Sequence, residues 1–195
     1  MQVFRKPVAS DSKSIEKLLG RVELSLQEDH LPPYFPYYTF DSNDFDGVYV
    51  YADRGKCVGL LCFSRTLDPI FSGKGRYRKQ DDLLSTIPFK GEDIALLRFL
   101  CVDPMDRRKK KGTEMFNSLS SLLSKTTFFA PISRFNAPGI EFLKSLGFYM
   151  VSEGAEMDVP DRTGIIMAKP YVKQGICSCL LYTSPSPRDR TRSRM

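Results

Sequence analysis

A long apolar segment followed closely by five consecutive cations is the feature that most restricts the fold of this chain. Residues 94–102 are almost continuously apolar, a pattern typical of a strand that is covered on both faces of its sheet. Arg107 to Lys111 are all basic, and an amphipathic helical stripe follows from Met115. A buried strand that leads through a charged turn into a helix predicts an α/β fold.

Apolar periodicity predicts the remaining elements. Ile15, Leu18, Leu19 and Val22 form one helical stripe, and a weaker helical pattern covers residues 24–31. A further helix is predicted from Pro138 to a stop at Gly147. Strands are predicted over residues 2–9, 46–53, 57–66, 94–102, 126–133, 148–152 and 164–168. The resulting order, β-α-α-β-β-β-α-β-α-β-β, predicts a mixed sheet with helices packed on it.

The chain length of 195 residues suits one domain, which we assign to residues 1–170, with an extension over 171–178. Residues 179–195 show no hydrophobic period and resemble the conceptual translation of a transposon-based sequencing adapter. A natural, basic tail rich in Ser and Pro is the alternative. We therefore exclude this tail from the prediction of the fold.

The net charge of +6 is concentrated in two places. The tail contributes four Arg and one Asp, and the run from Arg107 to Lys111 contributes five cations, which leaves −2 for the rest of the chain. Proteins that bind the nucleic-acid backbone usually spread Lys and Arg over a face. A nucleic-acid partner is therefore not expected.

Other classes of protein are disfavoured by short signals. The longest mostly apolar stretch, residues 57–63, is far shorter than the roughly 18 residues of a membrane helix, and the N-terminus lacks the apolar core of a secretory signal. The cysteines show no paired spacing and His30 is the only histidine, so buried thiols and no metal site are expected. We expect a cytoplasmic protein without membrane association, or a nuclear one if the basic run acts as an import signal.

The chemistry of the sequence is concentrated in residues 103–113. The start of a helix exposes unpaired N–H groups and the positive end of the helix dipole, an arrangement that binds phosphate. Gly112 would let a ligand approach the backbone, and the cations would add charge-assisted contacts to pyrophosphate. A solvated helix-entry loop, a nuclear-import patch and an RNA contact are alternative interpretations of the same residues.

This segment resembles motif A of the GNAT superfamily of N-acetyltransferases, Val-x-Pro-x-x-Arg-x-x-Gly-x-Gly or Ala. Val102, Pro104, Arg107 and Gly112 have the matching spacing, whereas Lys110 occupies the place of the first glycine. Residues 136–148, an Asn followed by a predicted helix that ends in Leu-Gly-Phe, resemble motif B. The resemblance covers residues 2 to about 170 and implies the GNAT-like acyl-CoA N-acyltransferase fold.

The resemblance also implies an acetyl-CoA site. In the family the pantetheine arm bonds to the backbone of the fourth strand, and the pyrophosphate rests on the amides of the turn that follows. Asn136 would contact the arm of the cofactor or brace the strands. The residues so implied are Leu100, Cys101, Val102, Arg107, Arg108, Lys109, Lys110, Lys111, Gly112, Thr113 and Asn136.

The catalytic residues of the family are less well matched. A Glu on the fourth strand often acts as general base and a Tyr in the motif B helix as general acid. The corresponding positions here hold Leu96 or Arg98, and Leu143. The replacement candidates for the base are Glu92, Asp93 and His30, and the candidate acid is Tyr149.

The function implied is transfer of acetyl from acetyl-CoA to a primary amine of a small molecule or a protein. Direct transfer needs only a neutral amine held against the thioester and polarisation of its carbonyl by backbone N–H groups. The aromatic stretch 31–38 lies where the family places a loop over the acceptor, and residues 67–93 could form a lid or an insertion. The alternatives are a catalytically inactive acyl-CoA sensor or scaffold and a basic module for RNA or an import receptor.

Overall fold

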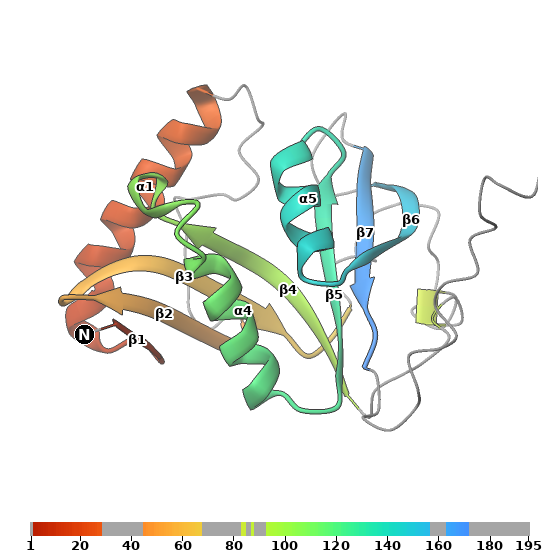
Figure 1. The fold of residues 1–195 in the computed structure, drawn as a ribbon, viewed down its shortest axis with the longest axis horizontal. Coiled ribbons are helices and arrows are strands. Elements are labelled where there is room, and N and C mark those ends of the chain that lie inside the picture. Colours follow the sequence, from red (N-terminus) through yellow and green to blue (C-terminus); the bar gives the residue numbers. More distant parts are fainter. Residues whose placement is uncertain are drawn as a thin grey trace, which may run out of the picture.

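The computed structural model describes residues 2–28, 45–67, 83–84, 87, 93–156 and 163–171. In these residues, seven strands form one mixed sheet in the order β1-β2-β3-β4-β5-β7-β6 (Figure 1). The strands are β1 (Gln2–Arg5), β2 (Gly47–Asp53), β3 (Lys56–Ser64), β4 (Asp93–Val102), β5 (Thr126–Ser133), β6 (Tyr149–Glu156) and β7 (Thr163–Lys169). The helices are α1 (Ser12–Glu28), α4 (Lys111–Leu122) and α5 (Ala137–Ser145), with short 3-10 turns η1 (Ala9–Asp11) and η4 (Pro104–Asp106). The predicted fold class is confirmed.

The N-terminal region differs in detail from the prediction. The strand predicted over residues 2–9 ends at Arg5, because Pro7 has no N–H to donate and Asp11 accepts hydrogen bonds from both Arg5 and the Val8 amide. The two helical patterns predicted before residue 31 run together as α1 as far as Glu28. Residues 29–31 lie outside the described residues.

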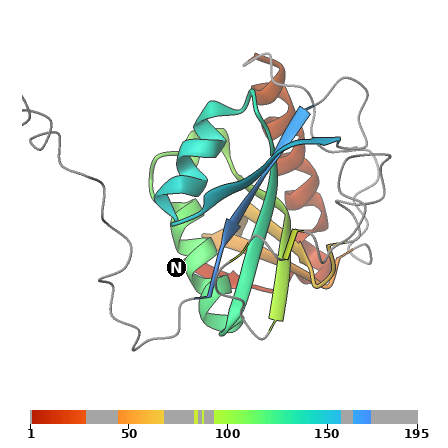
Figure 2. The same cartoon turned by 90° about the vertical axis from the view of Figure 1, so that its right-hand side faces the viewer.

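Helices cover both faces of the sheet, as Figure 2 shows. Successive residues of a strand point to opposite faces, so Leu61 and Phe63 pack with α4 and α5, whereas Leu60 and Cys62 pack with α1. Leu83 and Ile87, from the long connection before β4, are buried against Leu96 on a third apolar cluster. This two-sided cover explains why the sequence of β4 is almost continuously apolar.

The β4 and β5 strands separate along their length. They pair in parallel from Asp93↔Thr126 to Leu96↔Phe129, and no pair joins them beyond that point, although both strands continue. The pairing of β3 with β4 also shifts register between Leu97 and Phe99, which leaves Arg98 as the extra residue of a β-bulge. Bulges bend a strand and are frequent beside functional sites. From residue 97 onward, the edge of β4 that faces β5 therefore has no strand partner among the described residues.

The remaining local predictions concern the end of α5, the thiols and the membrane. Gly147 adopts a positive φ of 89° and closes α5, with its N–H donating to the Lys144 carbonyl and that of Phe148 donating to Leu143. Cys57, Cys62 and Cys101 are free and buried, as expected. Within the described part of the chain, no helix has the length and apolar character needed to cross a membrane.

Candidate phosphate-binding site

The turn between β4 and α4 combines unusual backbone geometry with an uncapped helix start. Arg108 and Lys110 have positive φ angles of 63° and 61°. Lys110 precedes the first helical residue of α4 and makes no side-chain cap, because an ammonium group has no acceptor. A left-handed residue followed by a helical one directs successive N–H groups into one concave site that suits an anion. The start of α4 thus has no cap from the Lys110 side chain, an arrangement that suits an anion.

Lys110 departs from the motif A pattern but has the backbone conformation that favours glycine. Glycine is favoured where φ is positive, and Lys110 adopts such a conformation at the position of the first motif glycine. A left-handed conformation costs a residue with a side chain roughly 1–2 kcal/mol. The chain therefore keeps the backbone shape that the motif requires, with a cation in place of a hydrogen atom.

The five cations of the run have different surroundings. Lys109 and Lys111 form ion pairs with Asp106, and Arg107 donates a hydrogen bond of 2.8 Å to Ser25 Oγ. Arg108 and Lys110 are exposed, and neither forms an ion pair with another described residue. These two side chains, both on left-handed residues, are the cations best placed to meet an anion at the helix start.

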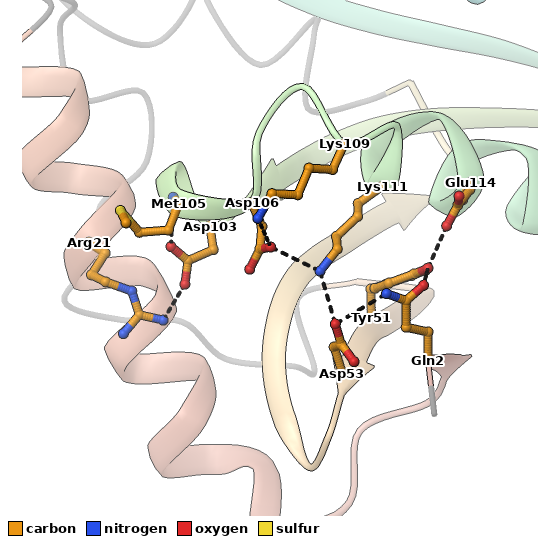
Figure 3. A network of polar contacts seen from close by, with 10 residues as sticks. All are labelled: Gln2, Arg21, Tyr51, Asp53, Asp103, Met105, Asp106, Lys109, Lys111 and Glu114. Carbon is orange, nitrogen blue, oxygen red and sulfur yellow. Dashed lines mark hydrogen bonds and ion pairs between the residues drawn. The ribbon is translucent and has the colours of Figure 1, made fainter.

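Two contacts fasten the turn to α1. Asp103, directly after β4, is buried and accepts a bond from the Met105 amide, which caps η4. Its other oxygen lies 2.6 Å from Nη2 of Arg21 on α1 (Figure 3). Together with the contact between Arg107 and Ser25, this pair fixes the turn on the side of α1.

Gly112 has a packing role as well as its expected role toward a ligand. A Cβ atom at this position would lie 3.1 Å from Cζ of Phe142 on α5 and 3.6 Å from Cγ2 of Val102. Atoms of Phe142 and Val102 therefore fill the space that a side chain at position 112 would need. A bulky substitution at Gly112 would disturb the packing of α4 against α5 in addition to any effect on binding.

The other predicted cofactor residues lie around the separated strands. Leu100 and Val102 pack toward α4 and α5, whereas Cys101 faces α1 and is buried. Thr113 lies in the first turn of α4. Asn136 follows β5, and its Oδ1 accepts a bond of 2.9 Å from the Gly139 amide, so this side chain caps α5. The amides of α5 are thus capped where those of α4 are not.

The predicted catalytic residues are not brought together. Asp93 begins β4 at the end opposite the basic turn. Tyr149 lies on β6 and is level with Leu96 through the pairs to Ala168 and Phe129, but about 14 Å away at the usual strand spacing. Glu92, His30 and the stretch 31–38 lie outside the described residues.

No acidic residue or tyrosine occupies the positions that the family resemblance assigns to the base and the acid, which hold Leu96 or Arg98, and Leu143. Leu96 is fully buried and Leu143 is 7% exposed within the main core. Arg98 is partly exposed, and its guanidinium lies 5.7 Å from the centre of the Phe45 ring. Among the described residues, the contact observed for this guanidinium is with an aromatic ring and not with a carboxylate.

Some features of the site were not predicted from the sequence. Pro131 in the middle of β5 could have indicated the separation of β4 from β5, because a strand tolerates proline where one edge lacks a partner. Pro131 lies just past the last β4–β5 pair. The pairing of Arg21 with Asp103 had no such signal, since 82 residues separate them.

The fold is that of known N-acetyltransferases. The structure is similar to the ribosomal-protein-S18-alanine N-acetyltransferase from Escherichia coli, with 20% identity, a TM-score of 0.60, and coverage of 93% of this chain and 99% of that one. It is also similar to Ard1 from Thermoplasma volcanium, with 17% identity, a TM-score of 0.60, and coverage of 88% and 99%.

A third similar structure contains a ligand. Arabidopsis thaliana NAA60 in complex with acetyl-CoA has 17% identity, a TM-score of 0.57, and coverage of 87% of this chain and 98% of that one. No protein-family model matches the sequence, and no curated protein matches it either. The three-dimensional comparison thus supports the fold that the two sequence motifs implied.

Proposed function

We propose that this protein is an N-acetyltransferase that uses acetyl-CoA to acetylate a primary amine of a small molecule or a protein. The observation that carries the proposal is the separation of β4 from β5 after Leu96 and Phe129, directly upstream of a helix start with uncapped amides. Ligands of α/β sheets bind outside the carboxyl ends of parallel strands. The acetyltransferase fold and the acetyl-CoA in the complex of NAA60 support the same ligand.

The residues of the turn fit a diphosphate. The amides of residues 111–113 start α4 without a side-chain cap, and Arg108 and Lys110 add positive charge that no described carboxylate pairs. The side chains of the other three cations, Arg107, Lys109 and Lys111, have partners within the protein. These residues would therefore contribute to diphosphate binding through their backbone amides and through the positive electrostatic potential of the turn. The partnerless edge of β4, which includes Leu100, Cys101 and Val102, offers backbone groups to the pantetheine arm.

Transfer to the amine is proposed to be direct. Acetyl-CoA would supply the acetyl group as a thioester, so that the amine nitrogen forms a C–N bond while the C–S bond breaks and the amine proton ends on the thiol. Backbone N–H groups on the free edge of β4 would polarise the carbonyl. Cys101, the thiol on this strand, is buried, and burial raises its pKa far above neutrality. A neutral, buried thiol is a poor nucleophile, which argues against an acetyl-cysteine intermediate.

We assign proton transfer to Tyr149 on β6 and to the acidic residues at the start of β4. The hydroxyl of Tyr149 carries its proton at neutral pH, as tyrosines ordinarily do, and burial raises its pKa further. Because three strand spacings separate Tyr149 from β4, its proton would travel through water. Asp93 is exposed at the start of β4 and, with Glu92, is our candidate for the base.

An acyl-CoA sensor or scaffold without turnover is the second candidate function. It is favoured by the buried Leu96 and Leu143, which stand where the family resemblance implies a base and an acid. Both functions require the same cofactor site and differ only in catalysis.

The experiment that tests the proposal is calorimetric titration of the full chain with acetyl-CoA, followed by measurement of thiol release with a panel of amines. The panel contains small amines and peptides with a free amino terminus. Binding together with amine-dependent release of thiol is expected for the enzyme. Binding without release with any amine supports the sensor, and no binding refutes both. Competition of RNA with CoA would instead support a basic RNA-binding module.

A further inference from the structure

Lys111 differs from its four basic neighbours because its side chain is buried. The side chain is 6% exposed, whereas residues 107–110 are exposed. Its Nζ lies 3.1 Å from Oδ1 of Asp106 and 3.2 Å from Oδ2 of Asp53 (Figure 3). A buried ammonium is costly unless it is paired, and two carboxylates pair this one.

The two carboxylates belong to different parts of the fold. Asp106 lies in η4, within the turn that leads to α4, and Asp53 ends β2. In the sheet β3 separates β2 from β4, so the bridge joins the turn after β4 to a strand two positions away. A single side chain thereby links the turn, the start of α4 and the end of β2.

Neighbouring contacts hold the same two elements together. Tyr51 and Asp53 are two residues apart on β2 and both face α4. The hydroxyl of Tyr51 hydrogen-bonds to Glu114 in the first turn of α4, and Gln2 Nε2 donates a bond of 3.1 Å to Asp53. The ring of Tyr51 also lies 6.0 Å from the ammonium of Lys111. The partners of Lys111 are therefore themselves fixed.

We infer that Lys111 is a positioning residue: its ammonium anchors the turn to Asp106 and Asp53, and so presents the amides of α4, with Arg108 and Lys110, to the diphosphate of acetyl-CoA. This inference rests on the proposed function. It assigns Lys111 a role distinct from direct contact of its side chain with phosphate, because both carboxylates already occupy the ammonium. Two left-handed residues, Arg108 and Lys110, make the turn costly to form, and the bridge offsets that cost.

The charge of the bridge persists over the physiological range. Burial alone would lower the pKa of Lys111, but hydrogen bonds and ion pairs with Asp106 and Asp53 outweigh it and raise the pKa above its usual value. The anchor is therefore permanent at neutral pH.

The test compares two ligands across matched variants of the full chain. Acetyl-CoA carries the diphosphate, and S-acetyl-pantetheine lacks it. Lys111→Met is expected to weaken binding of acetyl-CoA about tenfold, since misplacement of contact groups is costly, and to leave binding of S-acetyl-pantetheine unchanged. Lys111→Arg should restore most of the affinity for acetyl-CoA. Lys144→Met, which removes an exposed lysine paired with Glu141 on α5, is the control with the same charge change and should bind both ligands normally.

A second variant covers failure of Lys111→Met to fold. Asp53→Asn keeps the side-chain shape but removes one carboxylate of the bridge, and we expect acetyl-CoA affinity to fall about threefold, with S-acetyl-pantetheine again unchanged. Equal loss of both ligands, or no loss in any folded variant of the bridge, would overturn the inference while leaving the proposed function intact. Failure of the wild-type chain to bind acetyl-CoA would overturn both.

Discussion

Arg21 on α1 and Asp103 at the end of β4 form an ion pair in which Nη2 lies 2.6 Å from Oδ2. The arginine side chain is 45% exposed and the aspartate side chain 8% exposed, so loss of the pair would cost the buried aspartate more than the arginine. Arg21 can turn to water, but Asp103 cannot. The pair therefore connects the first helix of the chain to the turn that we assign to phosphate.

Removal of the arginine should destabilise the fold. Arg21→Ala leaves a buried carboxylate without its partner and is expected to lower the free energy of unfolding by about 1–3 kcal/mol. Lys17→Ala, at an exposed position of the same helix, should change it by less than about 0.5 kcal/mol. Urea unfolding measures both. Equal effects of the two substitutions would contradict the asymmetry described above.

Replacement of the left-handed lysine by glycine should stabilise the protein. In Lys110→Gly the relief of a left-handed conformation, about 1–2 kcal/mol, exceeds the entropic cost of a new glycine, about 0.4–1 kcal/mol. A net gain of about 0.5–1 kcal/mol is expected. Lys125→Gly, at φ 64° near the other end of α4, should give a similar gain. Only Lys110→Gly should weaken acetyl-CoA binding, more at low salt than at high salt. Equal acetyl-CoA affinities for the two variants would exclude Lys110 from the site.

The space around Gly112 can be tested against Gly20. No atom lies within 4 Å of a Cβ built at Gly20 in α1, so Gly20→Ala should stabilise the chain by about 0.5–1 kcal/mol. Gly112→Ala gains the same helix propensity but must displace the Phe142 ring, and its stability should stay at or below that of the wild type. In a Phe142→Ala background this ring is absent, so Gly112→Ala should raise the melting temperature in thermal unfolding.

Gly112→Trp should abolish acetyl-CoA binding, and its melting temperature will show how much of the loss of binding reflects disturbed packing.

Stability should fall steeply in acid. Hydrogen bonds from Arg5 lower the pKa of Asp11 against the opposing effect of burial, and Lys109 and Lys111 likewise lower the pKa of Asp106. Carboxylates of this kind contribute stability that is full above their unfolded pKa, about 4, and is lost as the pH falls through the lower folded value. Urea unfolding between pH 5 and pH 2.5 should show this loss, and Asp11→Asn should flatten it. Parallel curves for the two proteins would contradict the assignment.

Tyr149 should matter for turnover and not for binding. With an amine that the protein accepts, Tyr149→Phe is expected to lower kcat at least tenfold, since general acids contribute about 10²–10⁴-fold, and to leave the KM for acetyl-CoA unchanged. Tyr171→Phe removes a hydroxyl from a partly exposed position after β7 and serves as the control. An unchanged kcat for Tyr149→Phe would remove this residue from the mechanism.

The sequence was sufficient for the parts of the fold that depend on local pattern. The strand 126–133 matches β5 residue for residue, and Gly147 closes α5 where a helix stop was predicted. The basic turn was located because a phosphate site of this kind is built from consecutive residues. The sequence did not show which cations of the turn are exposed and which are buried, because burial of Lys111 depends on Asp53, which is 58 residues away. The β-bulge at Arg98 likewise depends on register with β3, which no short motif encodes.

A crystal structure of the full chain with acetyl-CoA tests the central claim most directly. The account predicts the diphosphate within hydrogen-bonding distance of the amides between residues 108 and 113, with the pantetheine arm beside the free edge of β4. A diphosphate bound elsewhere, or amides at the start of α4 that are capped by protein atoms in the complex, would contradict it.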